Sequence, residues 1–286
     1  MQQKELNALI SLLDEPSDLM FEQIRDKILF YGIEAVPLLE NAWDSSFNNT
    51  IQERIEGIIH VIQQENLKKE LQNWIQNNST DLLSGFLLAT QYQYPDQDKQ
   101  KIKDKISEIQ RSIWLELNED LTALEKIKVI NHIVFEVFGY HGNKSNIDTP
   151  RNLFLNDLIE TGKGNHLSLG MLLIILSHNL GIPVFGIDLP QHFILAYTEG
   201  NKNSDILFYI NPFNKGAVFT RKEIDLFIKY LKLNPEKKHF HPCDNITILK
   251  RLFSSLLIAY KKMGYADKVE ELNELVEVFN ITPSKI

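Results

Sequence analysis

Cysteine is almost missing from this chain of 286 residues. Its single cysteine, Cys243, has no partner for an intrachain disulfide and does not suffice for a zinc site built from thiolates. Basic residues are also in the minority, because 30 Lys and Arg stand against 38 Asp and Glu, which gives a formal net charge of −8. No strongly basic run offsets this deficit locally. We therefore expect no nucleic-acid partner.

Long hydrophobic runs are missing as well. The longest apolar stretch, residues 167–176, is too short to cross a bilayer, which takes about 20 apolar residues. The N-terminus reaches the charged residues Lys4 and Glu5 at once and has no apolar segment typical of a secretory signal. We therefore expect a cytoplasmic protein without a membrane partner.

The first 78 residues predict helices in pairs. Apolar residues recur at helical spacing, with a break at Pro16 and with capping signals at Ser17 and Gly32. The expected helices cover residues 6–13, 17–31, 33–43 and 51–62. Helix pairs with short loops are typical of HEAT-like repeats, but a free-standing array needs about three pairs. We therefore interpret residues 1–78 as a HEAT-like helical cap on the next domain.

Residues 79–233 are expected to form the central domain. Three helices are predicted between residues 80 and 138, followed by a long polar loop at 139–151 and a nearly unbroken apolar helix at 167–179. Three β-rich segments follow at residues 184–188, 192–197 and 206–210. A buried helix followed by antiparallel strands predicts an α+β core.

The C-terminal part of the chain returns to helical patterns. One helix is predicted from Arg221 to about residue 233, and two more lie in residues 234–286 with Gly264 between them. A helical hairpin of this length resembles one tetratricopeptide-type (TPR-like) unit. We interpret residues 234–286 as that hairpin.

Five short motifs occur in order between residues 150 and 213. They are Pro-Arg-Asn-Leu-Phe-Leu-Asn at 150–156, Gly-Asn-His-Leu-Ser-Leu at 164–169, Leu-Gly-Ile-Pro at 180–183, Leu-Pro-Gln-His-Phe at 189–193 and Asn-Pro-Phe at 211–213. Together they resemble the bacterial Sir-B-type transglutaminase-like family, over about residues 120–280. The resemblance implies a transglutaminase-like (papain-like) core with a helical C-terminal extension.

The resemblance also implies the position of an acyl-transfer site. Ser168 falls where transglutaminases carry their catalytic cysteine, His192 falls at the general base, and Asn211 falls at the third residue, which orients the imidazole. Asn is compatible with such a site, since papain-type enzymes use Cys-His-Asn. Serine is the serious departure, because a hydroxyl is far harder to ionise than a thiol. We therefore expect a degenerate site of a pseudoenzyme, with a hydrolase or acyltransferase that uses Ser168 as the alternative.

Each of these three residues also has an ordinary structural interpretation. Ser168 can cap or pack at the start of a helix, and His192 can hydrogen-bond a neighbouring loop. Asn211 precedes a proline, which is a common turn pair.

No cofactor or metal is predicted. His239, His241 and Cys243 offer three metal ligands within a short segment, but no fourth ligand is evident. Neither a phosphate-binding glycine-rich loop nor a nucleotide-binding fingerprint is present in the sequence.

The predicted function is regulatory binding of a protein or peptide segment in the cleft of a transglutaminase-like fold. The candidate binding residues are His141 and Arg151 of the long loop, and Asn165 and His166 at the start of the apolar helix. An enzyme that uses Ser168 is the alternative from a different class. A purely helical scaffold, in which the core only fills space, is the third.

Overall fold

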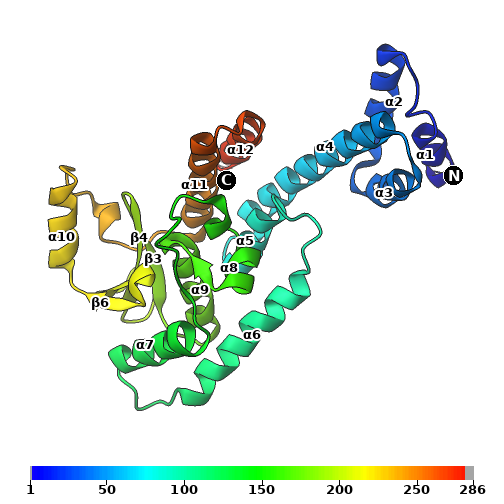
Figure 1. Ribbon diagram of the computed structural model, residues 1–286. Coiled ribbons are helices and arrows are strands. Elements are labelled where there is room, and N and C mark those ends of the chain that lie inside the picture. Colours follow the sequence, from blue (N-terminus) through cyan, green and yellow to red (C-terminus); the bar gives the residue numbers. More distant parts are fainter. Residues whose placement is uncertain (1, 281–286) are drawn as a thin grey trace. The chain divides into compact units, whose positions relative to one another are not determined.

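Two units, which meet in the sequence between Asn73 and Trp74, make up the chain (Figure 1). The computed structural model describes residues 2–280. Among these residues, no helix is both long enough and apolar enough to cross a membrane.

The first unit is helical and has a hydrophobic core of its own. Its helices are α1 (Gln2–Ile10), α2 (Asp18–Tyr31), α3 (Val36–Ser45) and α4 (Asn49–Asn73), with a 3-10 turn at Gly32–Ala35 before α3. Ser17 caps α2 and Gly32 ends it at a φ of 58°, as the sequence predicted. α4 is longer than expected, because residues 63–73 contain no glycine or proline that would end a helix.

The second unit contains a four-stranded antiparallel sheet. Its strand order is β3 (Val184–Leu189), β4 (His192–Thr198), β5 (Ile206–Asn211) and β6 (Ala217–Phe219). Two very short strands, β1 (His141–Gly142) and β2 (Lys163–Gly164), form a separate parallel pair. The sequence predicted β3, β4 and β5. It did not predict β1, β2 and β6, because strands of two or three residues are too short to show alternation.

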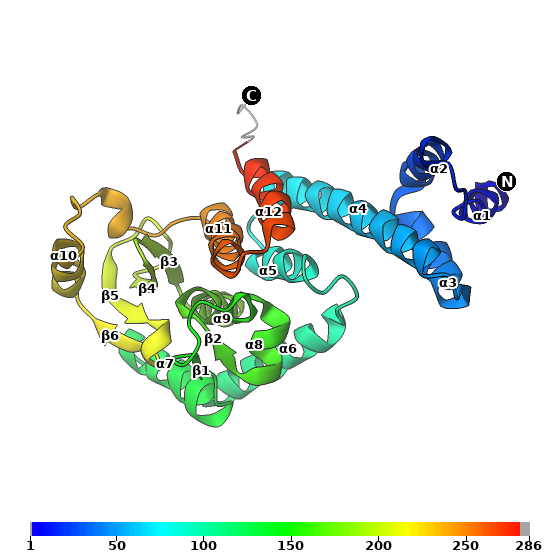
Figure 2. The same cartoon turned by 45° about the horizontal axis from the view of Figure 1, so that its top comes forward.

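Helix α9 (His166–Asn179) lies at the centre of the second unit. Every residue from Leu167 to Ser177 is buried. The helix packs on β3 and β4, and α5 (Leu82–Gln91), α6 (Lys99–Glu116) and α8 (Leu155–Thr161) also contact it (Figure 2). A helix without a polar face is stable only when it is covered on all sides. The expected buried helix on an antiparallel sheet is therefore confirmed.

Further helices complete the second unit. They are α7 (Ala123–Asn131), which continues as a π-helical turn at His132–Val137, then α10 (Arg221–Tyr230), α11 (Asn245–Met263) and α12 (Ala266–Val278). Short helical turns lie at Trp74–Asn78, at η4 (Pro150–Leu153), at η5 (Pro212–Asn214) and at η6 (Lys237–His239). α11 and α12 pack on each other, and α11 also contacts α5, η4 and β3.

The pleat of the sheet gives it two different faces. Phe193 and Leu195 of β4 point toward α9, where a Cβ on Gly170 would lie 2.7 Å from the Phe193 ring and 3.4 Å from Leu195. The alternate residues point to the other face, where α10 packs. The core on that face includes Leu189, Ile194, Ala196, Ile224 and Ile228. Consecutive residues of β4 therefore serve different sides of the sheet.

We expect Gly186→Ala to lower the free energy of unfolding by about 1–3 kcal/mol, because a methyl group on Gly186 would overlap the buried ring of Phe193. Gly200→Ala is the matched control, since the nearest atom to its added Cβ is 3.9 Å away. Denaturant unfolding of both variants measures the difference. Equal stability of the two would show that the Phe193 ring is not held tightly.

Candidate functional site

Ser168 lies in the first turn of α9, and its hydroxyl belongs to the helix cap. Oδ1 of Asn165 accepts hydrogen bonds from the backbone N–H groups of Leu167 (2.9 Å) and Ser168 (3.0 Å). In return, Oγ of Ser168 accepts one from the N–H of Asn165 (3.0 Å). The Ser168 side chain is 0% exposed. Ser168 and Asn165, which the sequence places at the nucleophile position and in the binding cleft, thus form the cap of α9.

The residue of α9 that faces His192 is His166. The two rings are in edge-to-face contact, with 5.7 Å between their centroids. Residues two apart on a helix point about 200° apart around its axis, so Ser168 points inward when His166 points toward β4. Within the described residues, no hydrogen bond joins His192 to Ser168 or to Asn211.

His192 and Asn211 line one pocket of about 330 Å³ on the α10 face of the sheet. Its walls are mainly apolar, and its lining consists of Leu189, His192, Ile194, Asn211, Asn214, Ala217, Val218, Phe219, Glu223, Ile224 and Phe227. We call it the His192 pocket. The His192 ring contacts Phe227, with 4.7 Å between the centroids. The lining contains no serine, threonine or cysteine, so no hydroxyl or thiol nucleophile faces the imidazole there.

Asn211 is a capping residue of η5. Its Oδ1 accepts hydrogen bonds from the backbone N–H groups of Phe213 (3.1 Å) and Asn214 (3.2 Å). This is the turn interpretation that Asn before Pro212 allows. Asn211 thus lines the pocket, but its oxygen shapes the turn and does not orient the imidazole.

Burial lowers the pKa of both histidines. The pKa of His166 falls to about 3, first because of its burial and then because of the positive charge of Arg251 and of the neighbouring His192. The pKa of His192 is lowered by burial and by Arg251. Arg251 is held beside β3 by an ion pair with Asp188 and a 2.9 Å hydrogen bond to the carbonyl oxygen of Leu189. Both imidazoles are therefore neutral at pH 7, each with one donor and one acceptor nitrogen.

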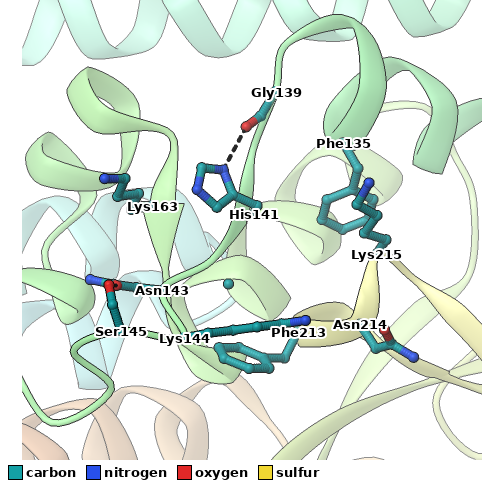
Figure 3. A pocket seen from close by; sticks show the side chains of 11 residues that line it. Phe135, Gly139, His141, Asn143, Lys144, Ser145, Lys163, Phe213, Asn214 and Lys215 are labelled. Carbon is teal, nitrogen blue, oxygen red and sulfur yellow. Dashed lines mark hydrogen bonds between the residues drawn. The ribbon is translucent and has the colours of Figure 1, made fainter.

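A larger pocket of about 630 Å³ lies where β1 and β2 meet η5 (Figure 3). We call it the basic pocket, because His141, Lys144, Lys163 and Lys215 line it and no Asp or Glu does. Its remaining lining is Phe135, Gly139, Gly142, Asn143, Ser145, Phe213 and Asn214. The long polar loop contributes residues 141–145 to the lining of this pocket. Asn214 lines this pocket and the His192 pocket alike.

Arg151 lies outside the lining of both pockets. Its Nε donates to Oδ1 of Asp157 (2.7 Å), and the hydroxyl of Tyr94 donates to Oδ2 (2.7 Å). Asp157 is buried, so Arg151 neutralises a carboxylate that would otherwise be costly to bury. Arg151 therefore pairs with a buried carboxylate and lines neither pocket.

The four candidate binding residues do not form one cleft. His141 lines the basic pocket and His166 lies against His192. Asn165 caps α9 and Arg151 pairs with Asp157.

Two of the three possible metal ligands in the His239–Cys243 segment form hydrogen bonds with the backbone. Nδ1 of His239 accepts a 3.1 Å hydrogen bond from the N–H of Glu236, and Sγ of Cys243 donates to the carbonyl oxygen of Gly186 at 3.2 Å. In the part of the chain that the structure describes, no three His, Cys, Asp or Glu side chains are grouped as a metal site would require.

The lysines of the basic pocket were not predicted as site residues. They are distant in sequence and are brought together by the pairing of β1 with β2 and by the turn after β5, which no periodicity reveals. In the sequence, the one indication of this pocket is Lys163, a lysine that lies between Gly162 and Gly164 and therefore in a turn-forming segment.

Acidification is expected to destabilise the protein through His166. Because its pKa falls from near 6.5 to about 3 on folding, the unfolded state binds more protons between these two values. The contribution of the neutral His166 to the free energy of unfolding is therefore fully present above about pH 6.5. As the pH falls below that value, this contribution decreases by up to about 1.4 kcal/mol per pH unit. His166→Phe keeps an aromatic ring against His192 without a titrating group. It should flatten the dependence of the denaturation midpoint on pH between 7 and 5.

His132→Phe is the matched control, because His132 is exposed on the turn after α7. This variant should keep the pH dependence of the native protein. If both variants kept it, the burial of a neutral His166 would not be what makes the fold sensitive to acid.

Comparison with known proteins identifies the second unit. Residues 100–254 match the transglutaminase-like superfamily. A UPF0162 protein of Xylella fastidiosa is 28% identical over 150 residues, which are 52% of this chain and 52% of that protein. A UPF0162 protein of Vibrio cholerae is 24% identical over 203 residues, which are 68% of this chain and 73% of that protein. The chain spans about half the length of the Xylella fastidiosa relatives.

F-box only protein 21 of Mus musculus is 22% identical over 164 residues, which are 54% of this chain and 25% of that protein. No solved structure matches the chain. The superfamily match covers more than half of the 286 residues and includes α9, the four-stranded sheet and the lining of both pockets. The chain therefore belongs to the transglutaminase-like superfamily.

Proposed function

We propose that the protein is a non-catalytic binding protein, whose transglutaminase-like core holds a protein or peptide segment along η5. One observation carries the proposal: the His192 pocket is lined by no hydroxyl or thiol nucleophile, and the Ser168 hydroxyl is buried in the cap of α9. Acyl transfer through a covalent intermediate requires a nucleophile within reach of its base. The pocket has a base, the neutral His192, but no side-chain hydroxyl or thiol in its lining for that base to activate.

The composition of the His192 pocket suits a side chain of a bound segment. Ligand pockets are mostly apolar with a few polar groups that fix orientation, and their volumes run from about 300 to 1,000 Å³. Leu189, Ile194 and Phe227 supply apolar wall, and His192 and Asn211 supply polar groups. An apolar side chain inserted there would lose its contact with water while the backbone beside it met polar partners.

The helical flanks fit the same proposal. We interpret residues 1–78 as a HEAT-like cap and residues 234–286 as a TPR-like hairpin, around a Sir-B-type core at 79–233. Helical repeats of these kinds offer extended surfaces to other proteins.

Labelling with a fluorophosphonate tests whether a nucleophile is absent. The native protein should stay unlabelled in intact-protein mass spectrometry, because the Ser168 hydroxyl is buried and hydrogen-bonded. Labelling that disappears in His192→Ala would instead establish a hydrolase or acyltransferase.

Two cysteine variants test the geometry of the α9 start. A thiol in His166→Cys would stand partly exposed at the helix N-terminus and near the positive charge of Arg251, which both favour the thiolate, whereas in Ser168→Cys it would be buried. We therefore expect iodoacetamide at pH 7 to modify His166→Cys faster, by about tenfold or more. Cys243 provides the background, since burial raises its pKa to about 12. Faster modification of Ser168→Cys would place the open position at residue 168.

Selection from a random peptide library tests the binding function. Enriched peptides should bind the native protein in fluorescence polarisation and lose about tenfold or more in affinity to Ala217→Phe, whose added ring would fill the His192 pocket. Ala266→Phe places the same ring on an exposed alanine of α12 and should change nothing. Failure to enrich any peptide, or equal binding by both variants, would refute the proposal.

A further inference from the structure

We infer that the basic pocket is an anion-binding subsite that holds a carboxylate or phosphate group of the bound segment. This inference rests on the proposed function and names the chemistry of the ligand. The pocket gathers His141, Lys144, Lys163 and Lys215 without a single acidic residue, in a chain whose net charge is −8. Such a local excess of one sign runs against the composition of the whole protein.

The backbone forces two of these basic groups together. The parallel register of β1 and β2 pairs His141 with Lys163, so their side chains are neighbours on one face. Figure 3 shows Lys163 and Lys215 on opposite sides of His141. Within residues 2–280, no ion pair joins Lys144, Lys163 or Lys215 to a carboxylate. Their charges are therefore uncompensated by the protein, and a bound anion would compensate them.

The wall that carries Lys215 is rigid. Lys215 has a left-handed backbone conformation with a φ of 51°, which costs free energy for any residue other than glycine. Two hydrogen bonds hold the turn. Nδ2 of Asn131 donates to the carbonyl oxygen of Gly216 (2.9 Å), and the N–H of Gly216 donates to the carbonyl oxygen of Asn211 (2.9 Å). Strain of this kind persists where the surroundings hold it, which is common at binding sites.

The wall of the basic pocket that β1 forms packs directly on η5, next to the turn that carries Lys215. A Cβ on Gly142 would lie only 2.5 Å from the Phe213 ring, so β1 and η5 pack without a gap. Nδ1 of His141 must donate to the carbonyl oxygen of Gly139 at 2.9 Å, because a carbonyl only accepts. This bond fixes the ring and makes Nε2 the acceptor nitrogen of the neutral imidazole, so Nε2 donates to a bound anion only when the ring is doubly protonated (Figure 3). The basic groups thus lie on a preformed frame, which lowers the entropic cost of binding.

The position of the basic pocket indicates what kind of molecule carries the anion. Asn214 lines both this pocket and the largely apolar His192 pocket. A ligand that fills both must present an acidic group and an apolar side chain a few residues apart, as a peptide with Asp, Glu or a phosphorylated residue next to a large apolar residue does. Charge complementarity selects the acidic segment, and the apolar pocket orients it.

The test uses the full-length protein, the peptides enriched from the library and inorganic pyrophosphate as a free anion. Lys163→Glu combined with Lys215→Glu should weaken binding of the enriched peptides by about tenfold or more, because attraction becomes repulsion. Lys202→Glu combined with Lys222→Glu makes the same change in net charge at exposed lysines outside both pockets and should have no such effect. Replacing the acidic residues of the peptides by their amides should reproduce the loss with the native protein. Pyrophosphate should compete with the peptides for the native protein.

Each contrary outcome has a distinct meaning. If the peptides bound Ala217→Phe more weakly but bound the Lys163/Lys215 variant as tightly as the native protein, the anion subsite would be overturned. The proposed function would remain intact. If no peptide were enriched while pyrophosphate raised the melting temperature of the native protein but not of the Lys163/Lys215 variant, the ligand would be a free anion, and its assignment to a peptide would be wrong. If the native protein bound neither pyrophosphate nor any peptide, both the anion subsite and the proposed binding function would be refuted.

Discussion

The reciprocal hydrogen bonds between Asn165 and Ser168 are the interaction on which the site depends. They fix the first turn of α9 and therefore decide which side chains face inward. His166 is directed toward β4, and the Ser168 hydroxyl is enclosed. In this transglutaminase-like core, the hydroxyl at residue 168 is part of the helix cap. The cap that stabilises the buried helix thus also engages the Ser168 hydroxyl, which supports the proposed non-catalytic role.

The pleat of β4 accounts for the rest of the arrangement. Since side chains alternate along a strand, Phe193 packs under α9 while Ile194 joins the core beneath α10. His192, at the first position of the strand, lines the pocket on the α10 side and still reaches His166 around the end of the sheet. Asn211 shapes η5, and η5 carries the wall between the two pockets.

The sequence predicted the large elements well and the site only in part. α9 was recognisable because its eleven consecutive buried residues form a nearly unbroken apolar run, and β3 to β5 were recognisable from their bounding Gly, Pro and Asn. Whether residue 166 or residue 168 of α9 faces His192 depends on the rotation of the helix about its axis. Spacing along the sequence does not determine that rotation. Arg151 resembled a loop cation, but the buried Asp157 that it neutralises is only visible in three dimensions. The lysines of the basic pocket meet through strand pairs too short to leave a pattern.

The shared wall at Asn214 has a consequence for selectivity. When two weak contacts are joined by a short piece of chain, the first raises the effective concentration of the second, and the combined affinity exceeds either one by orders of magnitude. A free anion or an isolated apolar side chain would gain only its own contact. In the proposed binding mode, the two pockets together would bind tightly only a molecule that carries both groups at the right separation.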